Sequence, residues 1–370
     1  SSVIRVRNLL IWLVSRTIYI KFSQSQSAFR FGKNCENDRI ANFGLYRQSE
    51  NLNTSFPQNS RFMEIILDSR FDSLEQLSSL TKAWDLDFRL VQNGGFLGQI
   101  RQTVMPEILI TYARFGTKLH QAGTTPPGYR TFGIPDKECQ GFWWLGNEVN
   151  SNCVTRFGTD SELMCVSNSD FAVYTLSLRE DYLEKLSESL GLSCPGTDRN
   201  VTRVASEEMA ILHQLARSAV FHRVSSVRTR VANQLAQRLL TDCADGTSVP
   251  CSSARSRDQA IKRVIDYLTE HGCNHPNLPD LCEVAHVSER TLQYAFRERY
   301  DLSPVQFVRC WHLNSARQLL LSSSHDGKTI GDIAGMCGFL DPSAFARHYR
   351  LLHGELPSAT IARANSNKYQ

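Results

Sequence analysis

Apolar residues recur at helical spacing near the C-terminal end of the chain, in the stretch TIGDIAGMCGFLDPSAFARHYRLLHGELP. A first group falls on one face of a short helix: Ile330, Ile333 and Ala334. Gly338 can then form a turn, and Asp341 can cap a second helix that starts with proline. The pattern predicts two short helices joined by a tight turn, which is the layout of a helix-turn-helix.

A similar pattern occurs about 53 residues upstream, in the stretch LPDLCEVAHVSERTLQYAFRERYDLSP. Leu281 aligns with Ile333 in the first helix, and Pro304 aligns with Pro357 after the second. Residues 303–323, between the copies, begin with Ser-Pro and carry apolar residues three and four apart, which predicts one continuous helix. The region therefore predicts two helix-turn-helix units joined by a connecting helix.

The second helix of each unit would turn a polar face to solvent, and that face holds the candidates for reading DNA. The buried residues are expected to be Leu292 and Phe296 in the first unit, and Phe345 and Tyr349 in the second. The outward residues are then Arg290, Gln293, Tyr294 and Arg297 on the first helix, and Ser343, Ala346, Arg347 and Arg350 on the second. Arginine suits guanine N7 and O6, glutamine suits adenine, and the outer Arg297 and Arg350 are expected to bind phosphates. The alternative is that these side chains are merely solvated helix charges.

Residues 258–362 resemble the DNA-binding domain of AraC-type transcription regulators. The shared motifs are Ser288 before the first recognition helix, Ser303-Pro304 before the connecting helix, Ala316-Arg317-Gln318-Leu319-Leu320 within it, and Ile330, Ile333-Ala334, Gly338-Phe339, Asp341, Ser343, Phe345 and Arg347 in the second unit. Asp301 departs from the family, which usually has glycine there. Because aspartate tolerates a left-handed backbone, we expect the turn to form. Ala344, at a position that is commonly aromatic, should leave its site less filled.

The resemblance implies a regulator that places two recognition helices in successive major grooves of double-stranded DNA. It also implies a small-molecule effector, RNA polymerase and a second copy of the chain as partners, hence a homodimer, and it suits an activator. The residues themselves do not distinguish an activator from a repressor. They also leave open a different functional class, a sensor or adaptor that acts through protein partners and keeps the helix-turn-helix only as a scaffold.

The charge and cysteine content of the chain indicate how it could bind DNA and in which compartment it would work. The whole chain carries a net charge of +4, and from residue 251 onward 14 Lys and Arg face 12 Asp and Glu, so DNA binding must depend on where the charges lie. Arginine makes up 11 of those 14 cations, which suits bidentate contacts to bases and phosphates. Eleven cysteines without a C-x-x-C pair are typical of a reducing cytoplasm. No apolar run reaches the ~20 residues of a membrane span.

The sequence predicts no metal site, no catalytic site and no cofactor. One sequence cluster could suggest zinc, but a polar loop between two helices explains it better: His271, Cys273, His275 and Cys282. Residues 63–185 contain a single histidine, His120, whereas metal-dependent cupin enzymes need several. An alkyl-accepting DNA repair module needs tightly grouped cysteines, and Cys139, Cys153 and Cys165 are too far apart in the sequence. The Pro-Cys-His-Arg motif of such modules is also absent from the sequence.

The first 62 residues differ in composition from the rest. Residues 22–60 are rich in Ser, Asn, Gln, Arg and Phe without a sustained period, and the first methionine is Met63. The apolar run NLLIWLVS is too short to cross a membrane, and no small-residue cleavage site follows it. We expect residues 1–62 to be a disordered extension and the regular protein to start near Met63.

Residues 63–185 show short β-favouring segments. The first part, FDSLEQLSSLTKAWDLDFRLV over residues 71–91, predicts one amphipathic helix. The segments GFLGQIRQTVM, ILITYARFG, YRTFGIP, GFWWLG and FAVYTLSL predict strands, hence a small barrel or sandwich. In GFWWLG, alternation should turn one tryptophan inward and its neighbour outward, either to fill a core or to line a ligand pocket. AraC-type regulators commonly hold a cupin-like effector-binding barrel at this place.

A further resemblance, to the sensor half of ethanolamine-operon regulators of the same family, is carried by the segments FDSLEQLSSLTKAW, GTKLHQAG, FGIP and LMCVSNSDFAVYTLSLRED. This resemblance implies that the effector is ethanolamine, with or without a cobalamin. Residues 186–240 return to helix and either pack on the barrel or form a dimer contact. Residues 241–256 are polar and punctuated by glycine and proline, as in a linker. The predicted fold is α+β: a cupin-like β-barrel sensor with flanking helices, then an all-α domain, residues 257–370, with two helix-turn-helix units joined by a linker helix.

Overall fold

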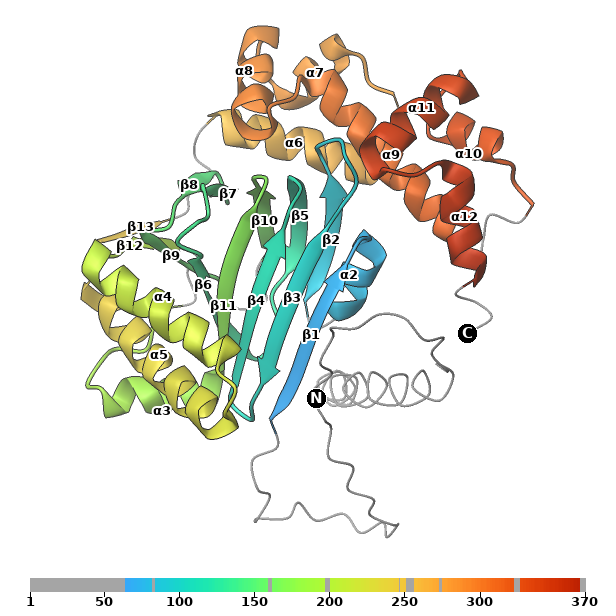
Figure 1. The fold of residues 1–370 in the computed structure, drawn as a ribbon. Helices are drawn as coiled ribbons and strands as arrows, with labels where there is room; N and C mark the ends of the chain where they lie inside the picture. Colours follow the sequence, from blue (N-terminus) through green and yellow to red (C-terminus); the bar gives the residue numbers. More distant parts are fainter. Residues whose placement is uncertain are drawn as a thin grey trace, which may run out of the picture. The chain divides into compact units, whose positions relative to one another are not determined.

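The computed structural model describes residues 64–81, 84–158, 162–196, 200–245, 247–250, 256–272, 275–322 and 327–366. The predicted extension, residues 1–62, lies outside these ranges. Figure 1 shows a β-rich region and a cluster of helices, and residues 63–370 form one unit. In the described ranges, no helix is both long enough and apolar enough to cross a membrane.

The strands form two antiparallel sheets. The larger has the order β1-β3-β4-β11-β6-β9-β12-β13, with the bounds Ile65–Phe71, Gly98–Val104, Ile108–Phe115, Phe171–Arg179, Tyr129–Pro135, Cys153–Arg156, Asn200–Arg203 and Thr247–Pro250. The smaller has the order β2-β5-β10-β7-β8, with the bounds Asp85–Leu90, Leu119–Thr124, Glu162–Ser167, Phe142–Trp144 and Asn147–Val149. Alternate side chains of both sheets, such as Phe88 and Trp144 from the smaller and Ile100 from the larger, enter one buried core.

The five strands predicted from the sequence are confirmed as β3, β4, β6, β7 and β11. The alternation in GFWWLG is confirmed as well, since Trp144 is 1% exposed and Trp143 is only partly buried. The predicted helix over residues 71–91 is wrong in extent, because only α2, Leu74–Leu80, is helical. Residues 85–90 form β2 instead, since DLDFRL alternates polar and apolar side chains and this period of two fits a strand.

Three helices cover the larger sheet: α3 (Glu180–Ser189), α4 (Ser206–Phe221) and α5 (Ser225–Asp245). The predicted return to helix over residues 186–240 is confirmed for α4 and most of α5, whereas α3 begins before residue 186 and residues 200–203 form β12. The apolar face of α4 is buried, since Leu212 and Ala216 share a cluster with Ile110 of β4. Residues 241–256, which were predicted to be a linker, contain regular structure in part. The first of these residues belong to α5, and β13 pairs with β12, so the sheet extends into this segment.

The C-terminal helices confirm the two predicted helix-turn-helix units. The first unit consists of α7 and α8, the second of α10 and α11, and α9 joins them. Helix α6 packs on the first unit, and α12 packs on α9 and α11. The bounds of α6 to α12 are Ser256–His271, Leu278–Ala285, Glu289–Tyr300, Pro304–Leu321, Ile330–Met336, Pro342–His353 and Pro357–Ser366. The predicted α+β class is therefore confirmed, with two antiparallel sheets followed by a helical domain.

Candidate nucleic-acid interface

Helix α8 presents a polar face because its apolar residues fall on the opposite side. Leu292 and Phe296 are 0% exposed and belong to a core shared with α6, α7 and α9. The helix begins after Ser288, whose hydroxyl accepts a hydrogen bond from the backbone N–H of Thr291 at 3.3 Å. It ends at Asp301, whose φ of 59° confirms the predicted left-handed turn. Caps at both ends thus define the residues that face outward.

Helix α11 repeats this design in the second unit. Asp341 caps it by accepting a hydrogen bond from the backbone N–H of Ser343 at 2.8 Å. Glycine is required in the turn before it, since Gly338 has φ 71° and a Cβ there would lie 1.2 Å from Nε2 of His275. The residues that were predicted to be buried are 0% exposed: Phe345 and Tyr349.

All eight predicted DNA-contacting residues lie off the buried faces. Exposed are Arg290, Tyr294, Arg297, Ser343, Arg347 and Arg350, and partly buried are Gln293 and Ala346. The guanidinium carbon of Arg290 lies 5.6 Å from the ring centroid of Tyr294. Among the described residues, no carboxylate pairs with Arg290, Arg347 or Arg350. Their positions agree with the prediction, and their contact with DNA stays a prediction.

One basic residue next to the second unit was missed by sequence reasoning. Arg309 on α9 and Arg347 on α11 both act on His348, whose pKa is lowered first by burial and then by these two guanidinium groups. Arg309 is exposed. Because DNA is a polyanion, a further arginine beside the recognition helix favours binding to its backbone. The helical spacing of α9 places Arg309 outward, but nothing in the sequence shows that α9 contacts α11.

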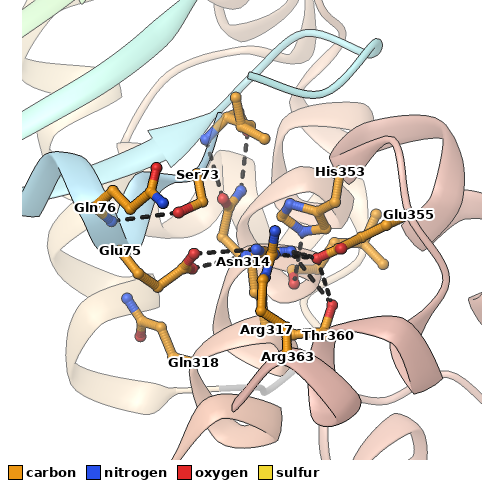
Figure 2. Close-up of polar contacts among 12 residues, drawn as sticks. Ser73, Glu75, Gln76, Asn314, Arg317, Gln318, His353, Glu355, Thr360 and Arg363 are labelled. Carbon is orange, nitrogen blue, oxygen red and sulfur yellow. Dashed lines mark hydrogen bonds and ion pairs between the residues drawn. The ribbon is translucent and has the colours of Figure 1, made fainter. Parts of the chain in front are cut away.

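On the opposite side of the helical domain, Arg317 is the centre of a buried ion-pair network (Figure 2). Arg317 belongs to α9 and is 5% exposed. Its Nε and Nη2 donate to the two carboxylate oxygens of Glu75 on α2 at 2.8 and 3.1 Å, and its Nη1 donates to Glu355 at 2.7 Å. Burial alone would raise the pKa of Glu75, but the hydrogen bond and charge of Arg317 hold it below its usual value. This arginine joins α9 to the β-rich region.

Strand β2 also contacts α9. The backbone N–H of Leu90 donates to Oδ1 of Asn314 at 3.0 Å, and Nδ2 of Asn314 donates to the carbonyl oxygen of Leu90 at 2.9 Å. The guanidinium of Arg89 lies 3.7 Å from the ring centroid of Trp311, and its Nη1 donates to Ser315 at 3.1 Å. These directional, largely buried contacts hold the connecting helix against the strand.

Each helix-turn-helix unit also touches the β-rich region directly. At the first unit, Lys118 forms an ion pair with Asp301, the C-cap of α8. At the second, the backbone N–H of Gly94 donates to the carbonyl oxygen of Leu351, near the end of α11, at 2.9 Å. Both recognition helices are thus held near their C-terminal ends, while their outward faces stay exposed.

A buried histidine lies where β5 meets the helical domain. His120 is 0% exposed, and its Nδ1 lies 3.3 Å from the hydroxyl oxygen of Tyr300 on α8. The rings of Phe307 and Trp311 lie at centroid distances of 6.4 and 5.9 Å. Burial, followed by repulsion from Arg89, lowers the pKa of His120 to about 4, so its imidazole is neutral at pH 7.

The histidines and cysteines between residues 271 and 282 do not form a metal site among the residues that the structure describes. Nε2 of His275 lies 2.7 Å from the carbonyl oxygen of Cys337, in the turn of the second unit. Cys273 lies outside the described ranges. His275 thus has a structural contact beside Gly338.

Comparison with known proteins bears on the C-terminal region of the chain. Residues 281–363 match the model of a helix-turn-helix domain family. The chain is 30% identical over 135 residues to the XylDLEGF operon transcriptional activator of Pseudomonas putida, covering 36% of this chain and 41% of that protein. It is 38% identical over 78 residues to the HTH-type transcriptional activator RhaR of Pectobacterium carotovorum subsp. carotovorum (strain PC1), covering 21% of this chain and 26% of that protein. A solved structure, a probable AraC family transcriptional regulator from Rhodopseudomonas palustris CGA009, is 30% identical; the match covers 28% of this chain and 96% of that chain, with a TM-score of 0.27.

The C-terminal region of the chain is similar to the helix-turn-helix domain of AraC-type transcription regulators. The resemblance stated for its C-terminal region is thereby confirmed, and the AraC-type helix-turn-helix domain is a DNA-binding domain. These relatives are named as transcriptional activators or regulators, in agreement with the expectation of a transcription regulator rather than an enzyme. The chain spans 41% of the length of the Pseudomonas putida activator.

Proposed function

We propose that the chain is a sequence-specific transcription regulator that inserts α8 and α11 into two successive major grooves. The observation that carries this proposal is the pair of capped helices whose exposed arginines have no carboxylate partner among the described residues. Helix α9 has 18 residues and is therefore about 27 Å long, a length compatible with two units that bind about 34 Å apart along DNA. Because the relatives are named as activators, we further propose activation through RNA polymerase.

A small effector would alter DNA binding through β2. Alternation divides the side chains of this strand between two sides, so Leu86 and Phe88 line a cavity between the sheets while Arg89 contacts α9. The backbone of Leu90 is bonded to Asn314 of α9 in both directions. A ligand that displaces the cavity side chains therefore displaces the strand to which α9 is bonded. Since α9 joins both units, its movement changes how the two recognition helices meet DNA.

The finer features of the sensor belong to the same proposal. Two antiparallel sheets around one core support a cupin-like effector domain. A homodimer contact on α4 and the turn after it is supported by two exposed apolar residues, Ile211 at 42% and Val224 at 52%. The resemblance of the sensor segments to ethanolamine-operon regulators makes ethanolamine one candidate effector, to be weighed against the chemistry of the cavity that β2 lines. A regulator of bacterial genes would act in the cytoplasm, where the chromosome lies.

Selection of bound fragments from a random pool of double-stranded DNA, followed by footprinting at physiological salt, tests the DNA-binding proposal. We expect one preferred sequence with two protected segments about 10 base pairs apart, one for each unit. The double variant Arg290→Ala/Gln293→Ala should lose protection of one segment, and Arg347→Ala should weaken the other. Equal binding to all sequences at physiological salt would instead support the adaptor alternative.

A further inference from the structure

A cavity of about 90 Å³ lies between the two sheets of the β-rich region. Its walls come from both sheets: Ile100 and Val173 belong to the larger sheet, and Phe88 belongs to the smaller. Aromatic rings make up much of the lining, and several meet edge to face. The ring centroids of Trp144 and Phe157, for example, lie 5.2 Å apart at an interplanar angle of 63°. Aromatic rings thus form a large part of the cavity wall.

The lining carries no formal charge. Among the described residues that line the cavity, none is Asp, Glu, Lys, Arg or His, and the polar ones are Thr81, Gln102, Thr111, Gln121, Thr155 and Thr175. Gln102 already donates to the hydroxyl of Thr111 at 3.0 Å. Gln121 is 7% exposed, and its amide nitrogen donates to Sγ of Cys165 at 4.0 Å, a long contact to a weak acceptor. Gln121 can therefore turn its amide to a ligand at little cost.

Trp144 supplies a second polar group with an unmet requirement. Its side chain lines the cavity and is 1% exposed. Its indole N–H has no acceptor among the described residues. A buried donor without an acceptor is unfavourable, and buried tryptophan N–H groups usually have a partner. An occupant of the cavity that accepts a hydrogen bond would meet this requirement.

We infer that the cavity binds a small, uncharged, largely apolar molecule that offers a hydrogen-bond acceptor to Trp144. This inference rests on the proposed effector response and adds the chemical class of the effector. A charged ligand would leave water for walls that offer no opposite charge, and the attraction of a cation to aromatic faces is smaller than that desolvation cost. Ethanolamine, which is an ammonium ion at neutral pH, therefore fits this cavity poorly.

The size of the cavity limits the ligand to about one ring. Apolar cavities of about 150 Å³ bind benzene. The cavity here is about 90 Å³, so a ring enters only when lining side chains move slightly. Leu86 and Phe88 of β2 are among those side chains, which connects ligand entry with the strand that contacts α9.

Direct binding to the full chain tests the ligand class with probes of similar size and different charge. The probes are benzyl alcohol, benzylamine and benzoate, with ethanolamine added as the effector suggested by sequence. Calorimetry should show binding of benzyl alcohol, together with an increase in Tm. Benzylamine, benzoate and ethanolamine should bind at least about tenfold more weakly, because each must bury a charge.

Three variants locate the site. Trp144→Phe keeps a ring and removes the N–H, so it should weaken benzyl alcohol binding about fivefold and leave toluene binding unchanged. Ala113→Leu adds volume to a residue of the lining and should abolish binding of both. Trp143→Phe is the matched control, since Trp143 is adjacent in sequence but does not line the cavity. It should leave benzyl alcohol binding unchanged.

Tighter or equal binding of a charged probe would overturn the inference. So would the absence of binding by every probe, or unaltered benzyl alcohol binding in both Trp144→Phe and Ala113→Leu. DNA selection on the same preparations separates this inference from the proposed function. Benzyl alcohol binding without sequence-specific DNA binding would overturn the proposed function and support the inference, whereas specific DNA binding without it would overturn the inference alone.

Discussion

Arginines on the two sides of the helical domain differ in burial and in partners. On the outer side, Arg347 and Arg350 are exposed and have no carboxylate partner among the described residues. On the inner side, Arg317 is 5% exposed and bonded to Glu75 and Glu355. An unpaired guanidinium is available to phosphate or guanine, whereas a buried and doubly paired one holds elements together. The same residue type is therefore available to DNA on one side and attaches the domain on the other.

Arg299 repeats the inner pattern in the first unit. It is 4% exposed, forms an ion pair with Asp258 of α6, and its guanidinium carbon lies 4.3 Å from the ring centroid of Trp143. Trp143 belongs to β7, so the first unit is attached to the smaller sheet as the second unit is to α2. Both units thus use a buried arginine inward and exposed arginines outward.

Removing Arg317 should have the largest effect on stability. Arg317→Ala leaves Glu75 and Glu355 without their shared counter-charge, so the free energy of unfolding should fall by roughly 3 kcal/mol. That value is at the low end for a buried pair because 38% of the Glu75 side chain stays exposed. Urea denaturation measures the change. The control is Arg363→Ala, because Arg363 also pairs with Glu355 but its side chain is 35% exposed. Its loss should lower the free energy of unfolding by less than about 1 kcal/mol. Equal losses in the two variants would contradict the inner role.

Acid should weaken the attachment through His120. The pKa of this buried imidazole is about 4 in the folded chain and near 6.5 ordinarily, so between these values the unfolded chain binds more protons. Its contribution to stability is complete above pH 6.5 and is lost as pH falls toward 4, by roughly 3 kcal/mol. Unfolding free energies measured from pH 7.5 to 4 should give a flatter profile for His120→Leu. Phe307→Leu, a change in the same aromatic cluster, should lower stability at every pH and keep the wild-type slope.

Removing the hydrogen bonds between β2 and α9 should lower the free energy of unfolding by a smaller amount. Asn314→Ala leaves the backbone N–H and carbonyl of Leu90 without their buried partners, which should cost about 1–2 kcal/mol. Hydrogen exchange at the Leu90 amide should become faster. Gln318→Ala, on the same helix but with an exposed contact to Asp87 at 3.4 Å, is the control. An unchanged exchange rate at Leu90 in Asn314→Ala would show that the hydrogen bond does not hold the strand.

The outer side of the helical domain could be predicted from sequence because its signals are local. The caps of α8 and α11, the turn at Gly338 and the buried Phe345 all lie within two short stretches, and together they define the outward residues. The inner side could not be predicted, because Glu75 and Arg317 are 242 residues apart and no local pattern shows which elements meet. Strand β2 was missed for a related reason: the helical spacing of α2 was extended into a segment whose own alternation has a period of two.

Two variants of the outer side separate base reading from backbone binding. Arg347→Ala should cost about 1–3 kcal/mol in binding to the selected site and relax the preference at one or two base positions. Arg350→Ala should weaken all sequences alike and reduce the slope of log binding constant against log salt by about one, because it removes one phosphate contact.

The most direct test that the outer arginines read DNA is to measure binding of the wild-type chain, Arg347→Ala and Arg350→Ala across all single-base variants of the selected site. We predict that Arg347→Ala loses preference at one or two positions, while Arg350→Ala keeps the wild-type preference profile at lower affinity. An Arg347→Ala protein that keeps the full wild-type preference profile would contradict the assignment of base reading to α11.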